Sequence, residues 1–383
     1  MKSLNRNSFS VGWFLKSFVL IILVLLWILP TIGLFVSSFR DKDQLAITGW
    51  WTSFSTSTSN EFKRTVTKEE QFERNGKYII FSKLPDLGRK KIQFFSTNFR
   101  KPNSFKAGET IILKDGSHFT LKGNGDYEWI SDIPFKHERG KRIFYVASVP
   151  PTFSLENYTE VLSSEGVGQS FMNTLKVTIP ATIIPIMIAS FAAYAFAWME
   201  FPGRKFLFVC VVGLLVVPLQ MSLIPLLSIY NEIGNYFGVS AKSYPGIWLA
   251  HTGFGLPLAI YLLRNYMGNI PREIIESARI DGASHFKIFT YIVAPLSVPA
   301  LASFCIFQFL WVWNDLLVAL VFLGKQDNQI VLTSKLRELL GSRGDNWEIL
   351  TSSAFISIVI PLFVFFALQR YFVRGLVTGS VKA

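Results

Sequence analysis

The sequence predicts an all-α polytopic membrane protein with six transmembrane helices, into which a small antiparallel β-rich extracytoplasmic domain is inserted. Uneven charge is the first observation behind this class. Charged residues fill 36 of the 129 positions from Arg40 to Gly168, but only 28 of the other 254. Soluble domains carry roughly 25% charged residues, so the first segment resembles a soluble domain and the rest is too apolar for one. A cytosolic enzyme and a disordered chain are therefore excluded.

Six apolar stretches are the second observation, because a helix needs about 20 mostly apolar residues to span a bilayer. The predicted spans are residues 14–39, 171–199, 206–229, 246–267, 291–323 and 354–372. Prolines occur inside several of them, which packed membrane helices tolerate. The first stretch has two interpretations, a retained helix or a cleaved signal peptide. Its apolar run exceeds the roughly 7–15 residues of a signal peptide, which favours a retained helix.

Basic residues in the short loops predict the orientation. With residues 1–13 in the cytoplasm, the inner side holds twelve lysines and arginines, whereas the short outer loops and the outer end of the second span hold six. Cytoplasmic loops of multi-pass proteins carry the excess of such residues. Both termini are therefore predicted to be cytoplasmic, with residues 40–168 outside.

Period-two hydrophobicity in residues 40–168 is the third observation. It predicts a β-rich domain over about residues 60–149, with strands at 78–81, 92–95, 110–113, 118–121, 127–130 and 142–149. Asp115-Gly116 predicts a type I′-like hairpin turn. His118 and His137 are the only histidines of this domain, and no zinc-protease, nucleophile-elbow or paired-cysteine pattern accompanies them. We expect a docking or structural module without catalytic or metal-binding residues.

Residues 269–290, between the fourth and fifth spans, form the predicted cytoplasmic loop that carries the function. Pro271 suits the first turn of a helix and Glu273 suits its positive end. Asp281-Gly282 would end this helix, because glycine accepts a positive φ. A second short helix would lead through Pro295 into the membrane. The first helix has two interpretations. It is either a helix that docks in a groove of a partner protein or a surface helix that lies among lipid headgroups.

This loop resembles the EAA loop of binding-protein-dependent ABC importers, whose pattern is Glu-Ala-Ala-x3-Gly-x9-Ile-x-Leu-Pro. Glu276-Ser277-Ala278, Gly282 and Ile292-Val293-Ala294-Pro295 follow that spacing, with departures at Ser277 and Ala294. Trp313-Asn314-Asp315 and the tail from Gln369 to Lys382 are similar to carbohydrate permeases of the maltose-permease G type. Gly49-Trp50-Trp51 and the long first outer loop are similar to the α-glucoside branch of that family.

The resemblance implies a type I ABC permease core over residues 169–374 and a transport subunit instead of an enzyme. The implied partners are a second permease subunit in a heterodimer, two copies of an ABC ATPase that bind ATP and Mg²⁺, an extracytoplasmic sugar-binding protein and membrane lipid, but no nucleic acid. This chain should bind no cofactor itself, since it contains no Gly-x4-Gly-Lys-Ser/Thr sequence. The implied location is the bacterial cytoplasmic (inner) membrane.

The resemblance also assigns residues to roles. The residues that would contact the ATPase are Glu276, Ser277, Ala278, Asp281, Gly282, Ala283 and Pro295. In the tail (residues 375–383) they are Gly375, Thr378 and Gly379. The implied cargo is an α-glucoside, a related di- or oligosaccharide, or a glucosylated solute.

A candidate substrate path is formed by polar and aromatic residues of the spans, because sugars bind to aromatic platforms and paired hydrogen-bonding groups. These residues are Gln220, Gln308, Trp311, Trp313, Asn314 and Asp315. An acid in a membrane helix indicates function or a buried pair, but Asp315 near the outer end has a second interpretation as a solvated or capping residue. The alternative functions are a membrane-anchored enzyme and a secondary carrier with an extracytoplasmic β-domain. An enzyme would need clustered acids or histidines, but the membrane part has only His251 and His285, far apart in the sequence. A proton-coupled carrier would need buried acids, for which Asp315 is the one candidate.

Overall fold

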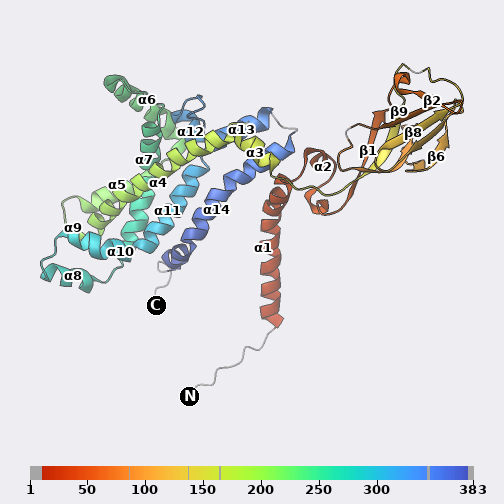
Figure 1. Cartoon of the computed structure of the whole chain (residues 1–383). Coiled ribbons are helices and arrows are strands. Elements are labelled where there is room, and N and C mark those ends of the chain that lie inside the picture. The colour runs from red at the N-terminus through yellow and green to blue at the C-terminus, as the bar shows by residue number, and fades with distance from the viewer. Residues whose placement is uncertain (1–10, 86, 137, 164, 343–345, 378–383) are drawn as a thin grey trace. The chain divides into compact units, whose positions relative to one another are not determined.

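The computed structural model describes residues 11–377 except 86, 137, 164 and 343–345. It divides into two compact units, Met1–Leu155 and Glu156–Ala383 (Figure 1). The tail positions Thr378 and Gly379, which the resemblance assigns to the ATPase contact, lie outside the described residues.

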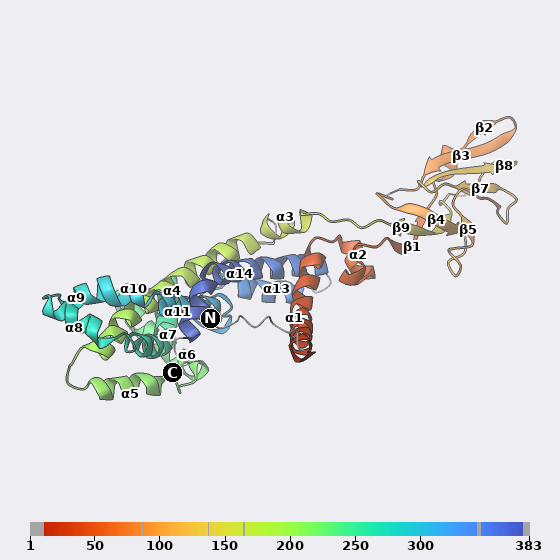
Figure 2. The same cartoon turned by 90° about the horizontal axis from the view of Figure 1, so that it is seen from below.

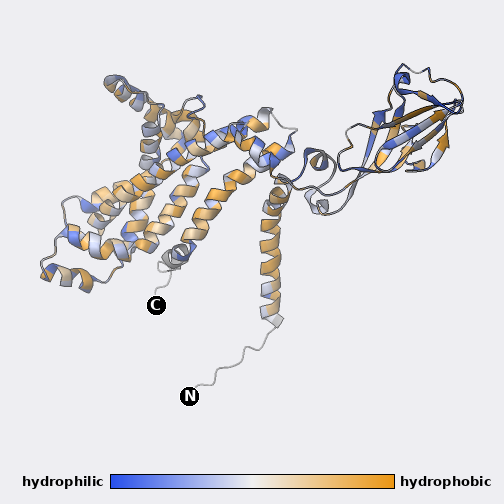
Figure 3. Ribbon diagram, viewed as in Figure 1, coloured by the Kyte–Doolittle hydropathy of each residue, from blue (hydrophilic) through white to orange (hydrophobic). Residues whose placement is uncertain are grey.

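Three helical segments open the first unit: α1 (Val11–Ser38), α2 (Lys42–Ile47) and the short 3₁₀ turn η1 (Trp50–Thr52). Helix α1 is apolar on all sides, as Figure 3 shows, and its Trp27 side chain is 85% exposed. A helix that is hydrophobic all round needs an apolar environment on every face. Its 28 residues correspond to about 42 Å, enough to cross a bilayer.

Nine antiparallel strands form the rest of the first unit. They are β1 (Ser57–Arg64), β2 (Phe72–Arg74), β3 (Lys77–Lys83), β4 (Lys91–Ser96), β5 (Phe105–Lys106), β6 (Thr110–Ile112), β7 (His118–Leu121), β8 (Asp126–Ser131) and β9 (Arg142–Val149). One sheet has the order β1-β9-β4-β5 and the other β2-β3-β8-β7-β6. Both sheets contribute to a single core, so this part of the chain is a β-sandwich.

The sandwich core is aromatic. Trp129 and Phe119 from the second sheet and Phe95 and Tyr145 from the first are at most 1% exposed. Trp129 packs 4.6 Å from Phe135 between ring centroids, and its indole Nε1 donates to Ser117 Oγ at 2.7 Å. The strand alternation that places these residues inside extends along β9, where every second residue is buried.

The turn between β6 and β7 differs from the predicted type I′-like turn. Gly116 has a φ of +80°, but Asp115 is not among the residues with positive φ, and a type I′ turn needs positive φ at both central positions. Leu113 O accepts from Gly116 N at 3.0 Å, and Leu113 N donates to Ser117 O at 2.8 Å. This is the pattern of a three-residue loop that ends on a left-handed glycine. The Asp115 carboxylate accepts a hydrogen bond from Ser117 N at 3.1 Å. Aspartate often makes this local bond to the backbone two residues further on in turns.

Glu61 on β1 forms a charged hydrogen-bond network with its neighbours. Lys90 Nζ lies 2.7 Å from Glu61 Oε1, and the Tyr145 hydroxyl donates to Oε2 at 3.1 Å. Burial raises the pKa of this carboxyl, but the hydrogen bonds from Lys90, Ser59 and Tyr145 and the charge of Lys90 outweigh it and hold the pKa below its ordinary value. Burial, and then the charge of Glu61, raise the pKa of Tyr145. The network therefore favours the ionised carboxylate.

The second unit is helical. Its elements are α3 (Glu156–Ser163), α4 (Val167–Trp198), α5 (Arg204–Leu214), α6 (Leu219–Phe237), α7 (Tyr244–Met267), α8 (Arg272–Ile280), α9 (His285–Ile288), the π-helical η3 (Phe289–Val293), α10 (Ala294–Leu296), α11 (Val298–Trp313), α12 (Leu317–Phe322), α13 (Leu332–Ser342) and α14 (Trp347–Val377). Helix α4 packs along α7, and α11 packs against both α4 and α14. In Figures 1 and 2, α8 and α9 lie at one end of this bundle and α13 at the other.

Four described helices, α1, α4, α7 and α14, are individually long and apolar enough to cross a membrane. The third and fifth predicted spans are not single straight helices. Helices α5 and α6 are bent by 107° relative to each other, and the helical segments His285–Leu296 and Val298–Trp313 by 72°. The number of spans is six only if each bent pair is one span.

Proline explains both bends. Pro218 precedes α6 and has no N–H to continue α5, and it restricts the residue before it. Pro295 and Pro299 flank the second bend, where the backbone of Ser297 (φ −90°, ψ 1°) leaves helical geometry and ends the first segment. The sequence analysis placed prolines inside continuous spans, whereas here Pro218 precedes α6 and Pro299 lies in the first turn of α11.

Candidate functional site

The loop between α7 and α9 carries most of the predicted coupling residues, and one side chain fixes its helix α8 to the bundle. Ile275 is 1% exposed and belongs to the same core cluster as Leu263 of α7 and Val293 of η3. The preceding Pro271 has a φ of −54°, which suits a helix start, and Glu273 lies in the first turn. The sequence prediction of a helix between Pro271 and Asp281 thus matches the position of α8.

A left-handed glycine ends α8. Gly282 has a φ of +78°, and its N–H donates to Arg279 O at 3.0 Å. The next residue, Ala283, donates to Ala278 O at 3.0 Å. Together these bonds satisfy carbonyls at the helix end, as in a glycine-terminated helix. Ser284 then begins α9, where its hydroxyl accepts from Lys287 N.

Two contacts tie the loop to the end of α4. Arg279 donates to Trp198 O at 2.9 Å, and His285 Nδ1 lies 2.9 Å from the Tyr194 hydroxyl. The Trp198 indole in turn donates to Met267 O at 3.0 Å, which joins α4 to the last residue of α7. The helix is therefore connected to α4, α7 and α9, so a force on it reaches three elements of the bundle.

The outer surface of the loop is exposed and mixed in character. Glu276, Ser277, Asp281 and Gly282 are exposed, whereas Ala278 and Ala283 are half-buried against the bundle. Large apolar side chains accompany them, with Ile280 86% and Phe286 66% exposed. Exposed apolar groups beside charged ones are typical of a protein contact surface. Sequence reasoning did not assign Ile280 of α8 and Phe286 of α9 to the contact. The signal that could have found them is an apolar residue on each side of the Asp281-Gly282 helix end.

The remaining predicted coupling residues are separate from this surface. Pro295 is exposed in α10, beyond the π-helical segment η3. Gly375 lies within the last turn of α14. The described residues bring neither of them into the loop surface.

The structure divides the six predicted substrate-path residues into two groups. Gln308, Trp313 and Asp315 are buried or nearly so, and each makes a structural contact. Gln308 Nε2 donates to Ala181 O at 3.0 Å, which joins α11 to α4, and Trp313 Nε1 donates to Ser357 O at 2.9 Å, which joins α11 to α14. Asp315 Oδ2 accepts from Ala319 N at 3.2 Å at the start of α12.

Asp315 also has a partner that sequence reasoning did not identify. His251 on α7 is 2% exposed, and its Nε2 lies 4.0 Å from Asp315 Oδ2. A small cavity of about 10 Å³ adjoins both residues, close to the volume that holds one water molecule. Sixty-four positions separate the two residues, so their approach depends on the packing of α7 against α12.

The other group is exposed. Trp311 is 41% exposed, and Asn314, the residue directly after α11, is exposed with its Nδ2 donating to Leu310 O at 2.8 Å. Phe307, one turn before Trp311, is 45% exposed, so these residues share one face of the helix. Gln220 is exposed in the first turn of α6. Among the described residues no group of three or more His, Cys, Asp or Glu could hold a metal ion.

Comparison with known proteins identifies the class of this chain. Residues 185–378 match the family described as binding-protein-dependent transport system inner membrane component. The alpha-glucoside transport system permease protein AglG of Rhizobium meliloti is 63% identical over 362 residues, which cover 94% of this chain and 95% of that protein. The osmoprotective compounds uptake permease protein GgtD of Synechocystis is 60% identical over 231 residues, 60% of this chain and 76% of that protein.

A solved bacterial ABC transporter for import of the acidic polysaccharide alginate contains a chain of related shape. The similarity has a TM-score of 0.49 and 22% identity and covers 59% of this chain and 82% of that chain. The family assignment depends on the match to AglG, which covers 94% of this chain, and on the family model, whose residues 185–378 include the loop described above. This chain belongs to the family of binding-protein-dependent transport system inner membrane components and is a permease subunit of an ABC transporter.

Proposed function

We propose that this permease serves an ATP-driven importer for α-glucosides or related di- and oligosaccharides or glucosylated solutes. The 63% identity to an alpha-glucoside permease over 95% of that protein supports the substrate class. The single observation that carries the coupling mechanism is the loop at α8, which is held to the bundle by buried Ile275 and exposes Ile280 and Phe286 beside Glu276 and Gly282.

In this proposal the exposed side of α8 docks in a groove of a separate ATPase subunit. Two ATPase copies, which bind ATP and Mg²⁺, close and open, and the contacts of Arg279 and His285 with α4 pass the movement to the bundle. Alternating access is then a two-state equilibrium biased by a ligand. A shift from 1:99 to 99:1 needs about 5.5 kcal/mol of differential binding. A second permease subunit completes the translocation path, and a sugar-binding protein delivers the cargo outside.

Ile280→Asp tests the docking surface. The exposed side chain makes no contribution to the core, so the substitution leaves membrane insertion intact but places a charge in the apolar contact. We expect loss of sugar uptake and loss of co-purification of the ATPase. Ile112→Asp on strand β6, where the isoleucine is 71% exposed, is the matched control and leaves both unchanged. Normal uptake by the Ile280→Asp variant would disprove docking through this surface.

The exposed face of α11 is the part of the candidate substrate path that we retain. Trp311 and Asn314 offer an aromatic platform and an amide on one helix face. Trp311→Ala should reduce uptake of the sugar while the ATPase still co-purifies. Trp27→Ala on α1, where the tryptophan is 85% exposed, is a control for loss of a surface indole. Equal uptake by wild type and Trp311→Ala would remove this residue from the path.

Uptake measurements with radiolabelled sugars distinguish the proposed substrate class from the alternatives. A deletion strain that loses uptake of sucrose, trehalose or maltose, and regains it only with both this chain and an ATPase, supports the importer. Uptake that persists when the ATPase is absent and instead follows a proton gradient would indicate a secondary carrier. Chemical conversion of the sugar by the purified chain would indicate a membrane enzyme.

A further inference from the structure

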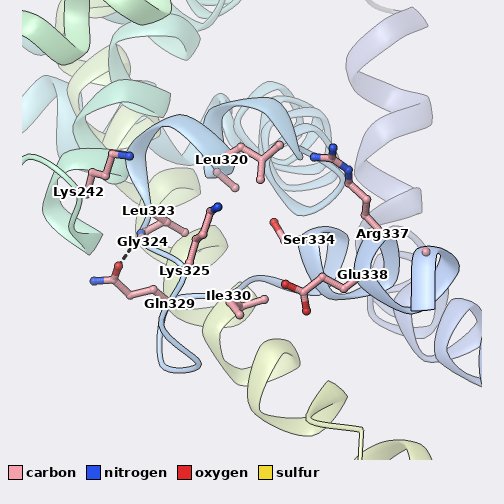
Figure 4. Close-up of a pocket in the computed structure, with 12 residues that line it drawn as sticks. Lys242, Leu320, Leu323, Gly324, Lys325, Gln329, Ile330, Ser334, Arg337 and Glu338 are labelled. Carbon is pink, nitrogen blue, oxygen red and sulfur yellow. Dashed lines mark hydrogen bonds between the residues drawn. The ribbon is translucent and has the colours of Figure 1, made fainter. Parts of the chain in front are cut away.

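A cationic pocket lies at the end of the bundle opposite α8 and α9, and the proposed function does not use it. Its volume is about 500 Å³, within the range of small-molecule sites. Three elements line it: the loop before α7, α12 with the loop that follows, and α13 (Figure 4). Lys242, Lys325 and Arg337 supply positive charge from these three elements in turn.

The positive charges of this pocket are not neutralised by the described residues. No ion pair is found for Lys242, Lys325 or Arg337 among the parts of the chain that the structure describes, whereas Glu338, the acid in the lining, is paired with Lys335 (Oε2–Nζ, 3.3 Å). Like charges around one cavity repel one another, and an anion between them relieves that repulsion. The charge distribution therefore favours an anionic ligand.

Part of the pocket lining is apolar. Leu320 of α12, Leu323 immediately after it, and Ile330 line the pocket together with the cations (Figure 4). A free inorganic anion gains nothing from such a lining, because its polar atoms would lose water against aliphatic side chains. A ligand with an anionic head and an apolar body satisfies both parts of the lining.

The position along the chain places the pocket at the level of lipid headgroups. Lys242 lies two residues before α7, a helix of 24 residues that corresponds to about 36 Å. This length matches the hydrocarbon core of a bilayer with a margin at each end. Lys242 therefore lies close to one membrane–water interface, and the loop charges predict that it is the outer one.

The pocket is built before a ligand arrives. The loop that carries Lys325 is held by Asn173 of α4, a residue with no exposed surface, whose Nδ2 donates to Asp327 O at 2.8 Å and Ile330 O at 3.0 Å. Gln329 Oε1 accepts from Gly324 N at 2.6 Å within the same loop (Figure 4). A fixed loop loses little conformational entropy on binding, which favours a specific site over a diffuse charged surface.

We propose that this pocket binds an anionic glycerophospholipid, with the phosphodiester among Lys242, Lys325 and Arg337 and the start of an acyl chain on Leu320 and Leu323. Clustered lysine and arginine side chains near a membrane surface attract anionic lipid headgroups. The bound lipid would join the loop before α7, α12 and α13 on one side of the bundle. The proposal is independent of which sugar the transporter carries.

Lipid binding by the purified, assembled transporter tests the proposal. Native mass spectrometry is carried out with phosphatidylglycerol and with phosphatidylcholine of the same acyl chains. The variant K242Q/K325Q/R337Q should bind phosphatidylglycerol at least about ten-fold more weakly, with phosphatidylcholine unaffected. K101Q/K122Q/K136Q removes three exposed lysines of the β-domain and is the matched control, which retains wild-type binding.

Further arms separate the apolar and anionic contributions. Leu320→Gln should weaken phosphatidylglycerol binding and leave unchanged the effect of added inorganic phosphate on that binding. The variant should fold normally, because Leu320 is 44% exposed and its loss does not disturb the core. Inorganic phosphate that competes with phosphatidylglycerol at equal concentration would make the pocket a free-anion site and overturn the lipid proposal. Unchanged phosphatidylglycerol binding by the triple variant would also overturn the lipid proposal. If that variant instead bound the extracytoplasmic binding protein more weakly, the pocket would be a contact site for an acidic surface of that protein. A thermal melt of each variant verifies folding, and Lys325→Gln alone, which should show a smaller loss, replaces the triple variant if that variant does not fold.

Discussion

Substitution of Gly282 isolates the backbone conformation of the proposed coupling loop from its side-chain contacts. Its φ of +78° is a conformation that L residues rarely adopt, and no atom lies within 4 Å of a Cβ placed there. Alanine at this position therefore adds backbone strain without a steric clash. Asparagine tolerates the left-handed region better than alanine does, and proline, with φ fixed near −65°, does not enter it at all.

The expected magnitudes follow from these geometries. Alanine costs about 1–2 kcal/mol in the left-handed conformation, which lowers the population of the native turn by a factor of roughly 5–30. Proline in addition removes the N–H that donates to Arg279 O at 3.0 Å, a loss of about 1 kcal/mol. The turn at Gly282 also aligns the hydrogen bond from Ala283 N to Ala278 O. Loss of the turn would therefore displace Phe286 relative to Ile280. We expect uptake in the order glycine, asparagine, alanine, proline, with none for proline.

The assay is sugar uptake by cells that carry each variant, with the amount of chain in the membrane and of co-purified ATPase measured in parallel. Membrane insertion should be the same for all four, because the residue is exposed and outside the core. Gly76, with a φ of +74° and an equally open surrounding in the β2–β3 turn, supplies the control. Gly76→Ala carries the same strain and should leave uptake unchanged. Wild-type uptake and ATPase retention by Gly282→Pro would refute the reasoning.

Three further predictions concern stability. Because the pKa of Glu61 is lowered, the ionised carboxylate stabilises the β-domain at pH values above the ordinary carboxyl pKa, and this stabilisation is lost as the pH falls through the lowered pKa. Glu61→Gln should therefore be less stable than wild type at pH 7, by about 1 kcal/mol. In strong acid the two should be equally stable, as measured by limited proteolysis of the full chain. Trp129→Ala should destabilise the same domain by about 3–5 kcal/mol, seen as rapid cleavage near β8, and a domain that resists protease equally well would contradict the aromatic core. Asp315→Ala should lower the stability of the bundle by about 0.5–2 kcal/mol, because the hydrogen bond from Ala319 N is lost. Asp315→Asn should retain most of the wild-type stability. Equal melting temperatures of wild type and Asp315→Ala would show that the bond contributes nothing.

Local patterns predicted much of the helical and strand content. The apolar stretches at 171–199 and 246–267 correspond to α4 and α7 within a few residues, and the predicted strand 142–149 is β9. These elements are recognisable because one period of hydrophobicity persists over their whole length. Strand β1 was not predicted, since its side chains are mostly polar and it is defined by pairing with β9.

The breaks in the third and fifth predicted spans show where local pattern is insufficient. Hydropathy is continuous across Pro218 and across Pro295 to Pro299, and a proline can either kink a helix or end it. Which outcome occurs depends on what packs beside the freed backbone groups, and the sequence does not contain that information in any window. The bends of 107° and 72° therefore became visible only in the structure.

The sequence by itself predicted the membrane class, the β-rich insertion and the short helix between Pro271 and Asp281, because each depends on composition, period or a run of adjacent residues. Tertiary structure alone divided the candidate path into buried Gln308 and Trp313, half-buried Asp315, and exposed Gln220, Trp311 and Asn314. It also brought His251 to Asp315 and gathered three cations, two from loops and Arg337 from α13, around one pocket. The physical reason is that burial and proximity are properties of packed surfaces, and residues far apart in a chain acquire them only when the helices that carry them come together.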